Sequence, residues 1–285
     1  MVKRMDYAVN GVLKMRIGII SDLHIDRYNN SEDNIPLYEE ALISEINTRN
    51  IELLLIAGDI SNNYDLTMDF IRKVARQSDT EIKFVPGNHD LWQKEITQDT
   101  EAVLGRYSEQ PECLVERPYI INDEWAIAGH TGWYDYTYAS REFSYDRLEK
   151  RAYYGGTWQD KHNIAWRYND VEMSRQFSRA VRKDLESLGD RKIILVTHIV
   201  TSKRFRVPMP HRLFDYYNAF IGTSDFNDIY NDFPVHYSIM GHVHFRHSLT
   251  ENGITYICPC LGYKREWRTD DIRTEIGNAF YVIEI

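Results

Sequence analysis

Cysteine is scarce in this sequence. Its 285 residues include only three, Cys113, Cys258 and Cys260. A sparse, odd count argues against a disulfide framework, and Cys258-Pro259-Cys260 lacks the two-residue gap of a redox motif. We therefore expect reduced, partly buried thiols, as is usual for a cytoplasmic protein.

Long hydrophobic runs are lacking as well. No stretch approaches the roughly 20 apolar residues that a membrane-spanning helix requires. Residues 1–20 contain no long apolar segment ahead of a small-residue cleavage site. We predict neither a membrane segment nor a secretory signal. Residues 1–14 are interpreted as either a flexible leader or an upstream start, followed by one domain over residues 15–285.

The chain has no excess of positive charge. It carries 34 Lys and Arg against 43 Asp and Glu, which gives a net charge of −9. Proteins that bind duplex nucleic acid are more often basic, so a nucleic-acid partner is not expected. Two short basic clusters, at residues 202–206 and 264–268, have the composition of ordinary solvated surface.

The sequence does contain enough apolar material for a large core, because 43% of its residues are hydrophobic. The first ninety residues alternate strand and helix patterns. The predicted strands are 16–20, 51–57 and 82–85, and the predicted helices are 36–49 and 66–77. Residues 51–57 are continuously apolar, which is typical of a strand buried on both faces. This alternation predicts parallel βαβ units in an α/β fold.

The remaining chain continues with strand patterns at 113–116, 125–128, 191–196, 235–240, 254–257 and 279–285. A helix is predicted over residues 169–188, with Asn169 as its cap, Glu172 as the reciprocal partner and Gly189 as its end. Residues 133–168 hold 11 aromatic residues in 36. We interpret about residues 131–188 as a cap-like elaboration over one end of a sheet.

Five apolar runs end directly on side chains that can bind metals. These are Asp22-Leu23-His24, Gly58-Asp59, Gly87-Asn88-His89-Asp90, Thr197-His198 and Gly241-His242-Val243-His244. Ligands of open α/β sheets bind beyond the carboxyl ends of the strands. In extended backbone, residues two apart point the same way, so Asp22 and His24 can grip one region. The glycines before these side chains allow tight turns and close approach.

Each motif also has an ordinary explanation. Asp59 could be a turn residue or a helix cap, His198 a hydrogen-bonded core histidine, and residues 88–90 an Asx-turn. Five such motifs in series are hard to explain as coincidence. Burying the resulting carboxylates and imidazoles without a cation would be costly. The set therefore predicts a metal centre.

The ordered series D-x-H, G-D, G-N-H-D, T-H and G-H-x-H, over residues 17–244, resembles the calcineurin-like metallophosphoesterase superfamily. The resemblance implies two mixed β-sheets flanked by helices, a four-layer αββα sandwich, with a dinuclear metal centre at the C-terminal ends of the strands. It implies that one metal is held by Asp22, His24, Asp59 and His244, and the other by Asp59, Asn88, His198 and His242. The shared carboxylate would reduce the repulsion between the two cations. Nitrogen and oxygen donors without a thiolate suit Mn, Fe or Zn.

The same resemblance implies how the residues would act. A hydroxide bridging two metals would be acidic enough to attack phosphorus near neutral pH. His89 resembles the general acid that protonates the leaving group. Asp90 would orient the His89 imidazole and favour its protonated form.

Substrate selection is expected from insertions around the strand ends. The candidate binding residues are His130, Trp133, Tyr134, Arg204, Arg206 and His211. The ordinary alternatives are a packed aromatic corner for the first three and a simple surface loop for the others. We expect a small soluble phosphomonoester or phosphodiester as substrate. A nuclease acting on single strands and a non-catalytic metal-binding scaffold are the alternatives.

Overall fold

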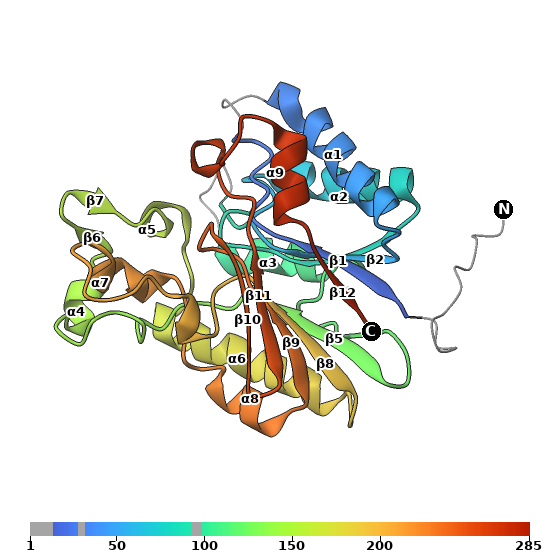
Figure 1. The fold of residues 1–285 in the computed structure, drawn as a ribbon. Coiled ribbons are helices and arrows are strands. Elements are labelled where there is room, and N and C mark those ends of the chain that lie inside the picture. The colour runs from blue at the N-terminus through green and yellow to red at the C-terminus, as the bar shows by residue number, and fades with distance from the viewer. Residues whose placement is uncertain (1–13, 28–31, 93–98) are drawn as a thin grey trace.

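Two β-sheets lie face to face at the centre of the molecule (Figure 1). The computed structural model describes residues 14–27, 32–92 and 99–285, so the predicted leader lies outside the described residues except for Lys14. The four-stranded sheet has the order β12 (Tyr281–Glu284), β1 (Arg16–Ile20), β2 (Leu53–Ala57) and β3 (Glu81–Val85). The six-stranded sheet has the order β10 (Arg246–Glu251), β11 (Ile254–Pro259), β9 (Val235–Ile239), β8 (Lys192–Thr197), β5 (Trp125–His130) and β4 (Tyr119–Ile120).

Both sheets are mixed, as expected. In the first sheet β1, β2 and β3 run parallel and β12 is antiparallel to β1. In the second, β5, β8, β9 and β11 run parallel, with β4 and β10 as antiparallel edge strands. The parallel strands of each sheet therefore end at a common edge, which is where polar loops can gather.

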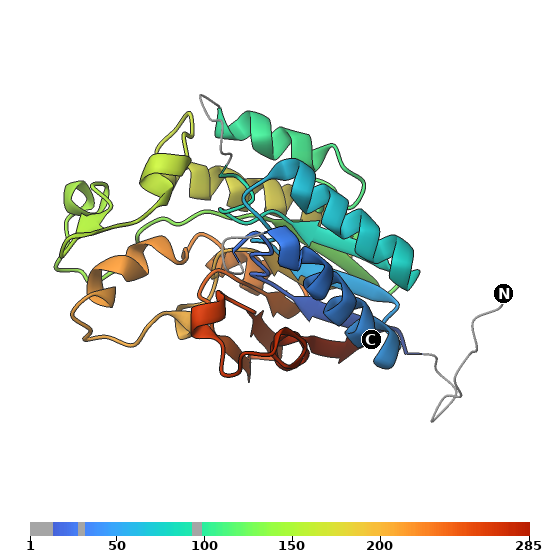
Figure 2. The same ribbon diagram turned by 90° about the horizontal axis from the view of Figure 1, so that it is seen from above.

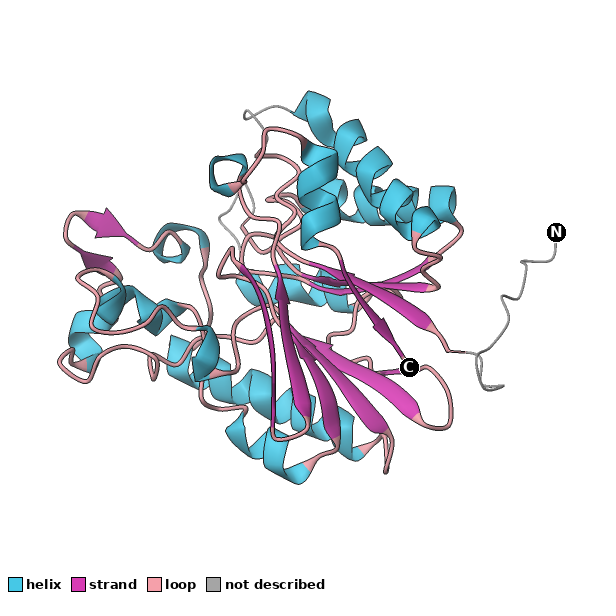
Figure 3. Cartoon of the chain, viewed as in Figure 1, coloured by secondary structure: helices cyan, strands magenta, loops and turns pink. Residues whose placement is uncertain are grey.

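Helices cover the outer face of each sheet, which completes four layers (Figures 1 and 3). The first sheet is covered by α1 (Ile35–Thr48), α2 (Tyr64–Ser78) and α9 (Ile272–Ala279), and the second by α6 (Asp170–Glu186) and α8 (Asn227–Asp232). Apolar side chains of both sheets, such as Leu55 and Val196, share one fully buried cluster between them. Every residue of β2 is buried, which confirms the interpretation of its continuous apolar run.

A separate group of short elements projects on one side of the sheets (Figures 1 and 2). It contains α4 (Tyr145–Leu148), β6 (Ala152–Tyr153), β7 (Gly156–Thr157), α5 (Asp160–Asn163) and α7 (Phe214–Tyr217). Two segments distant in the sequence meet here, because the Tyr153 and Tyr216 rings stack with centroids 4.8 Å apart. The Tyr217 hydroxyl also donates to the Tyr153 carbonyl at 2.8 Å. We call these two segments, residues 131–168 and 204–226, the cap.

The remaining short elements complete the chain. They are α3 (Thr100–Ser108) and the 3-10 turns Glu32–Asn34, Lys203–Phe205, Asn218–Phe220 and Lys264–Glu266. Among the described residues, every helix is too short or too polar to span a bilayer. All three cysteines are buried and free.

The predicted strand at 113–116 is wrong. Cys113 forms an isolated bridge with Phe84 of β3, and Val115 forms one with Gly129 of β5. The segment thus passes from one sheet to the other and pairs with neither for long enough to form a strand. By contrast, the prediction for the start of α6 is confirmed. The Asn169 side chain accepts a hydrogen bond from the Glu172 amide, so Asn169 is the N-terminal capping residue of this helix.

Candidate metal centre

The five predicted motifs converge, but they come from two sheets and not from one. Asp22, His24 and Asp59 follow β1 and β2 of the first sheet, whereas His198 and His242 follow β8 and β9 of the second. The metal-binding atoms form two groups, each within 4.8 Å: Asp22, His24, Asp59 and His244, and Asp59, His198 and His242. Asp59 belongs to both groups.

Asn88 joins the second group. Its Oδ1 lies 3.0 Å from His198 Nε2, and the same nitrogen lies 3.1 Å from His242 Nδ1 and 3.3 Å from Asp59 Oδ1. The structure therefore brings together all seven residues that the motifs predict as ligands.

The backbone at these positions is left-handed, which corrects the extended geometry expected for the paired ligands. Five of the seven have a positive φ, namely Asp22 (55°), His24 (44°), Asp59 (56°), His242 (73°) and His244 (54°). Non-glycine residues rarely adopt this conformation, and it tends to be retained at functional sites. Gly58 has φ 85°, and a Cβ at Gly87 would collide with the Asp59 carboxylate. The glycines thus permit the turn and the close approach that the motifs require.

Three of the four histidines are held by an acceptor on their outer ring nitrogen. These pairs are His198 Nδ1 with the Ala57 carbonyl at 2.9 Å, His242 Nε2 with the Phe220 carbonyl at 3.1 Å, and His244 Nδ1 with Glu266 Oε2 at 2.8 Å. A carbonyl or carboxylate accepts the proton of that nitrogen and leaves the other nitrogen with a free lone pair. In each case the other ring nitrogen faces the cluster, where it can bind a metal in place of a proton.

The charges of the cluster also fit cations. Although burial lowers the pKa of His198, the adjacent Asp59 carboxylate raises it to about 9. Burial likewise acts against protonation of His244, but Asp22 and Glu266 raise its pKa to about 10. Asp59 Oδ2 is buried and has no hydrogen-bond partner among the described residues. The carboxylates therefore favour positive charge at this point, and the donor set fits two metal ions.

Asp160 of the cap is a buried residue that the motifs did not reveal. Its carboxylate accepts four hydrogen bonds, from Asn88 Nδ2 (2.8 Å), Trp92 Nε1 (2.8 Å), Trp158 Nε1 (2.8 Å) and the Tyr134 hydroxyl (3.2 Å). Because Asn88 donates its amide nitrogen to Asp160, its amide oxygen is left to face the cluster. A lone acidic residue among tryptophans and tyrosines was the only sequence signal for it.

His89 lies beside the cluster. Its ring stacks against Trp92 with centroids 3.7 Å apart. Its Nδ1 lies 3.0 Å from Asn62 Oδ1, and its Nε2 lies 3.1 Å from the Tyr263 hydroxyl. The His89 amide donates to Asp59 Oδ1 at 2.8 Å, so the backbone of this residue is tied to the bridging carboxylate.

Both ring nitrogens of His89 thus face partners other than Asp90, which corrects the orienting role expected of that residue. The Asp90 carboxylate accepts hydrogen bonds from the backbone amides of Ile60, Ser61 and Gly87 and from the Thr67 hydroxyl. Asp90 therefore ties the loop after β2 to the loop after β3. Burial and the nearby Asp59 carboxylate raise the pKa of Asp90 to about 7.

A hollow of about 440 Å³ opens over the cluster. Metal-side residues such as Asp59 and His242 form its floor. Its cap-side wall is largely apolar and contains Trp158, Val207, Phe214 and Ile221. An organic group attached to a phosphate at the cluster would therefore contact the cap.

The first three predicted substrate residues are not in this hollow but in the core. His130 is 1% exposed and packs against Phe177 with ring centroids 4.1 Å apart. Trp133 and Tyr134 are fully buried, and Trp133 Nε1 donates to Asp170 at 2.7 Å. The packed aromatic corner is thus the correct interpretation, because these polar atoms find internal partners.

The three basic candidates do not line the hollow either. Arg204 pairs with Glu251 at 2.6 Å on the surface. His211 Nδ1 accepts hydrogen bonds from the Leu213 and Phe214 amides, which stabilises the turn before α7. Arg206 is absent from the lining of the hollow. The segment at 204–226 does reach the site, but through apolar residues that carried no sequence signal.

Comparison with known proteins agrees with this geometry. A family model described as calcineurin-like phosphoesterase matches residues 15–246. The chain belongs to the calcineurin-like phosphoesterase family. It is a metallophosphoesterase, a hydrolase, as the resemblance of the motifs implied.

Solved structures share the fold across most of the chain. A phosphopantetheinyl hydrolase of Mycobacterium tuberculosis is 18% identical, with 95% of this chain and 96% of that one covered and a TM-score of 0.73. A dimetal phosphatase of Danio rerio is 13% identical, with 86% of each chain covered and a TM-score of 0.53. A protein of Thermus thermophilus is 10% identical, with 95% and 98% covered and a TM-score of 0.55. None of the curated proteins compared with the chain matches it.

Proposed function

We propose that this phosphoesterase hydrolyses a small soluble phosphomonoester or phosphodiester at a two-metal centre. The observation that carries the proposal is the convergence of seven side chains, in which three of the four imidazoles have their outer nitrogen on an acceptor and their other nitrogen toward the cluster. Asp22, His24, Asp59 and His244 would hold one ion, and Asp59, Asn88, His198 and His242 the other. The ligand types suit Mn, Fe or Zn.

Other side chains of the site would hold His89 as the general acid. When bound, the two cations supply an acidified nucleophile and neutralise charge on the phosphoryl group. Asn62 fixes the His89 ring through Nδ1, so Nε2, which lies 3.1 Å from the Tyr263 hydroxyl, is the nitrogen that would face the leaving oxygen. The Trp92 ring covers one face of the imidazole and limits its contact with water. His89 is thereby positioned as the general acid.

Protonation of His89 depends on the substrate. Burial lowers the pKa of this imidazole well below its ordinary value, although Asp59 opposes the change. An anionic phosphoester beside the ring would raise that pKa and stabilise the imidazolium. The acid would then be charged in the complex, where its proton is needed.

The hollow over the cluster supports a substrate with an organic substituent of modest size. A volume of about 440 Å³ lies within the ordinary range of small-molecule sites. Its apolar wall favours a phosphoester whose organic substituent is aliphatic or aromatic over one whose substituent is a sugar. The name of the M. tuberculosis protein of similar fold makes a phosphopantetheinyl ester one substrate to include in a screen.

Metal analysis combined with hydrolysis of two generic esters tests the proposal. The protein should contain about two metal ions and hydrolyse 4-nitrophenyl phosphate, bis(4-nitrophenyl) phosphate or both in the presence of Mn²⁺. Asp59→Asn should lose metal and activity together, because Asp59 belongs to both ligand groups. A protein with no metal and no hydrolysis of either ester would favour the non-catalytic scaffold.

A single-strand nuclease is the second candidate function. The basic residues Lys264 and Arg265, from one of the predicted clusters, line a second hollow together with His89. Cleavage of single-stranded DNA that falls steeply with salt would favour this function over small-ester hydrolysis.

A further inference from the structure

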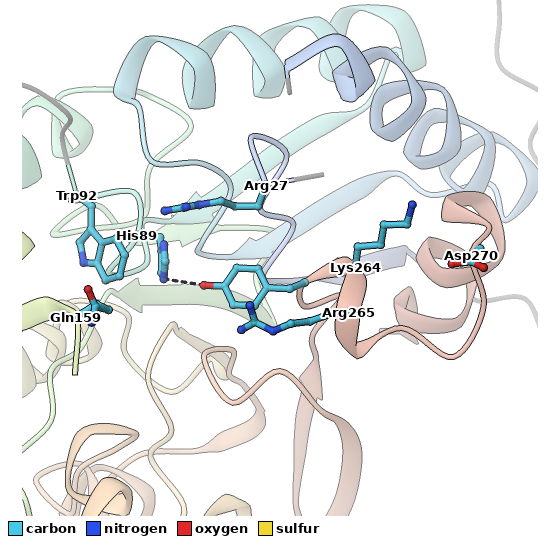
Figure 4. Close-up of a pocket in the computed structure, with 8 residues that line it drawn as sticks. Arg27, His89, Trp92, Gln159, Lys264, Arg265 and Asp270 are labelled. Carbon is cyan, nitrogen blue, oxygen red and sulfur yellow. Dashed lines mark hydrogen bonds between the residues drawn. The ribbon is translucent and has the colours of Figure 1, made fainter. Parts of the chain in front are cut away.

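A second hollow, of about 650 Å³, extends from His89 and Trp92 toward Asp270 (Figure 4). It is lined by Arg27, His89, Trp92, Gln159, Tyr263, Lys264, Arg265 and Asp270. Five of these residues, His89, Trp92, Gln159, Tyr263 and Arg265, also line the hollow over the cluster. The two hollows therefore adjoin at the candidate general acid.

The second hollow is basic although the protein as a whole carries a net charge of −9. Three of its lining residues are basic and one is acidic. In Figure 4, Arg27 and Arg265 lie on opposite sides of the dashed hydrogen bond between His89 and the Tyr263 hydroxyl, whereas Asp270 lies at the end remote from His89. Positive charge is thus concentrated at the end where a leaving group would enter. Such a concentration attracts anions and raises their local concentration.

Arg265 is held in place without being fully neutralised. Its guanidinium carbon lies 4.6 Å from the centroid of the Tyr263 ring, and the nearest Glu266 oxygen is 3.7 Å from its Nη2. The Glu266 carboxylate is engaged elsewhere, because Oε2 lies 2.8 Å from both His244 Nδ1 and the Tyr263 amide nitrogen. The guanidinium keeps donors free for a planar or tetrahedral anion.

Arg27 approaches from the other side. Its side chain is exposed, and its charge contributes to the fields at both His89 and the Tyr263 hydroxyl. Among the described residues, no carboxylate forms a salt bridge with it. Two guanidiniums from segments more than 200 residues apart in sequence thus flank the same hydrogen bond. The Tyr263 ring also packs against His24 and His244, with centroids 4.4 Å and 4.6 Å apart, so the ring that the Arg265 guanidinium covers contacts the candidate metal centre.

We propose that the second hollow binds an anionic group on the leaving-group side of the substrate. The preferred substrates would then be phosphoesters whose leaving alcohol carries its own phosphate or carboxylate. Arg27 and Arg265 would be the binding residues. This inference rests on the proposed function, since it assumes that His89 faces the leaving oxygen.

Three esters with similar alkyl leaving groups test the inference: 1,3-propanediol bisphosphate, 3-phosphooxypropanoate and propyl phosphate. With the metal-loaded protein, kcat/KM should be about tenfold or more higher for the two charged leaving groups, as expected for a charge-assisted hydrogen bond. The ratio between the bisphosphate and the carboxylate shows which anion the hollow prefers. If only diesters react, the methyl diesters of the same three alcohols replace the monoesters.

Substitution of the two arginines tests whether they cause the preference for charged leaving groups. Arg27→Gln and Arg265→Gln should each reduce the preference for charged leaving groups, measured as the ratio of their kcat/KM to that of propyl phosphate, by about tenfold. Arg268→Gln is the matched control, because Arg268 is exposed on the same segment as Arg265 but does not line the hollow. All three substitutions are at exposed side chains, and metal content verifies that each variant folds.

The possible results distinguish a failure of the anion site from a failure of the proposed function. Equal kcat/KM for charged and uncharged leaving groups would overturn the anion site while leaving the phosphoesterase intact. A single-stranded oligonucleotide preferred over the bisphosphate would show that the hollow binds a nucleic-acid backbone and would overturn the small esters as preferred substrates. Absence of hydrolysis with these esters and with both nitrophenyl esters would instead contradict the proposed function.

Discussion

Asp160 accepts a hydrogen bond from the side-chain amide of Asn88 at 2.8 Å, although the two residues are 72 positions apart. One belongs to the cap and the other to the loop after β3. The contact fixes which end of the Asn88 amide faces the cluster. The cap thus contacts the candidate metal centre directly, in addition to forming a wall of the hollow.

Replacing Asp160 with Asn should weaken one metal site. The substituted amide can donate to Asn88 as well as accept from it, so the orientation of the Asn88 oxygen is no longer fixed. Loss of such a partner typically reduces metal affinity by about 10–100-fold. Titration with Mn²⁺, followed by metal content and by activity, would measure this. Asp146→Asn, at an exposed position of the same cap, is the control; equal metal affinities in the two variants would contradict the role.

Replacing His89 with Asn should reduce turnover and leave metal binding unchanged. Removal of a general acid typically costs about 10²–10⁴-fold in rate. The loss should be smaller for a 4-nitrophenyl ester than for an alkyl ester, because nitrophenolate needs less protonation. Metal analysis, together with kcat for both esters, would test both parts of this prediction. A variant that is fully active with its metals bound would exclude His89 as the acid.

Replacing Tyr263 with Phe keeps the ring between His24 and His244 but removes the hydroxyl beside His89 Nε2. We expect a decrease in kcat of up to about tenfold, in line with the loss of one hydrogen bond, and a change in the alkaline limb of the pH–rate profile, where the general acid loses its proton. Metal content should not change, because the ring contacts remain. A pH profile that coincides with that of the wild type would show that the hydroxyl does not influence the acid.

Stability should depend on pH through Asp184, which is remote from the metal centre. Burial, and then the charge of Glu116, raise the pKa of this carboxyl to about 6. One of its oxygens is buried and has no hydrogen-bond partner among the described residues. The protonated form is therefore favoured in the fold. Its contribution to stability is complete below about pH 4 and is lost as the pH rises through about 6.

Asp184→Asn should accordingly stabilise the protein at pH 8 by about 1 kcal/mol, a value discounted because the side chain is only half buried. At pH 4 the difference should nearly disappear. Urea unfolding of the metal-loaded protein at several pH values would measure it. Asp190→Asn, an exposed neighbour just beyond α6, serves as the control. A variant that is less stable than the wild type at pH 8 would contradict the assignment.

The sequence singled out the candidate metal ligands because each lies just after a buried strand, and three of the seven, Asp59, Asn88 and His242, directly follow a glycine. Local pattern suffices for such residues. It does not suffice for the groups that orient them. Asp160 is recognisable only once Asn88 is near it, and the Phe220 carbonyl that holds His242 has no side-chain signature at all.

The substrate residues were predicted less well for a different reason. Aromatic residues near a strand end have the same pattern whether they line a pocket or fill a corner, and Trp133 and Tyr134 fill a corner. The predicted strand at 113–116 was wrong because a hydrophobic pattern does not show where the chain crosses from one sheet to the other. In both cases the long-range packing, which the local sequence does not encode, decided the outcome.

The ligands all stand on loops of the two-sheet frame, while much of the wall above them comes from two inserted segments. The candidate metal ligands and the residues that would select the substrate thus come from different segments of the sequence. A relative could exchange the inserted stretches and acquire a new substrate while keeping its metals. The exception is Asp160, since any replacement cap must still supply a carboxylate, or an equivalent acceptor, to the Asn88 amide.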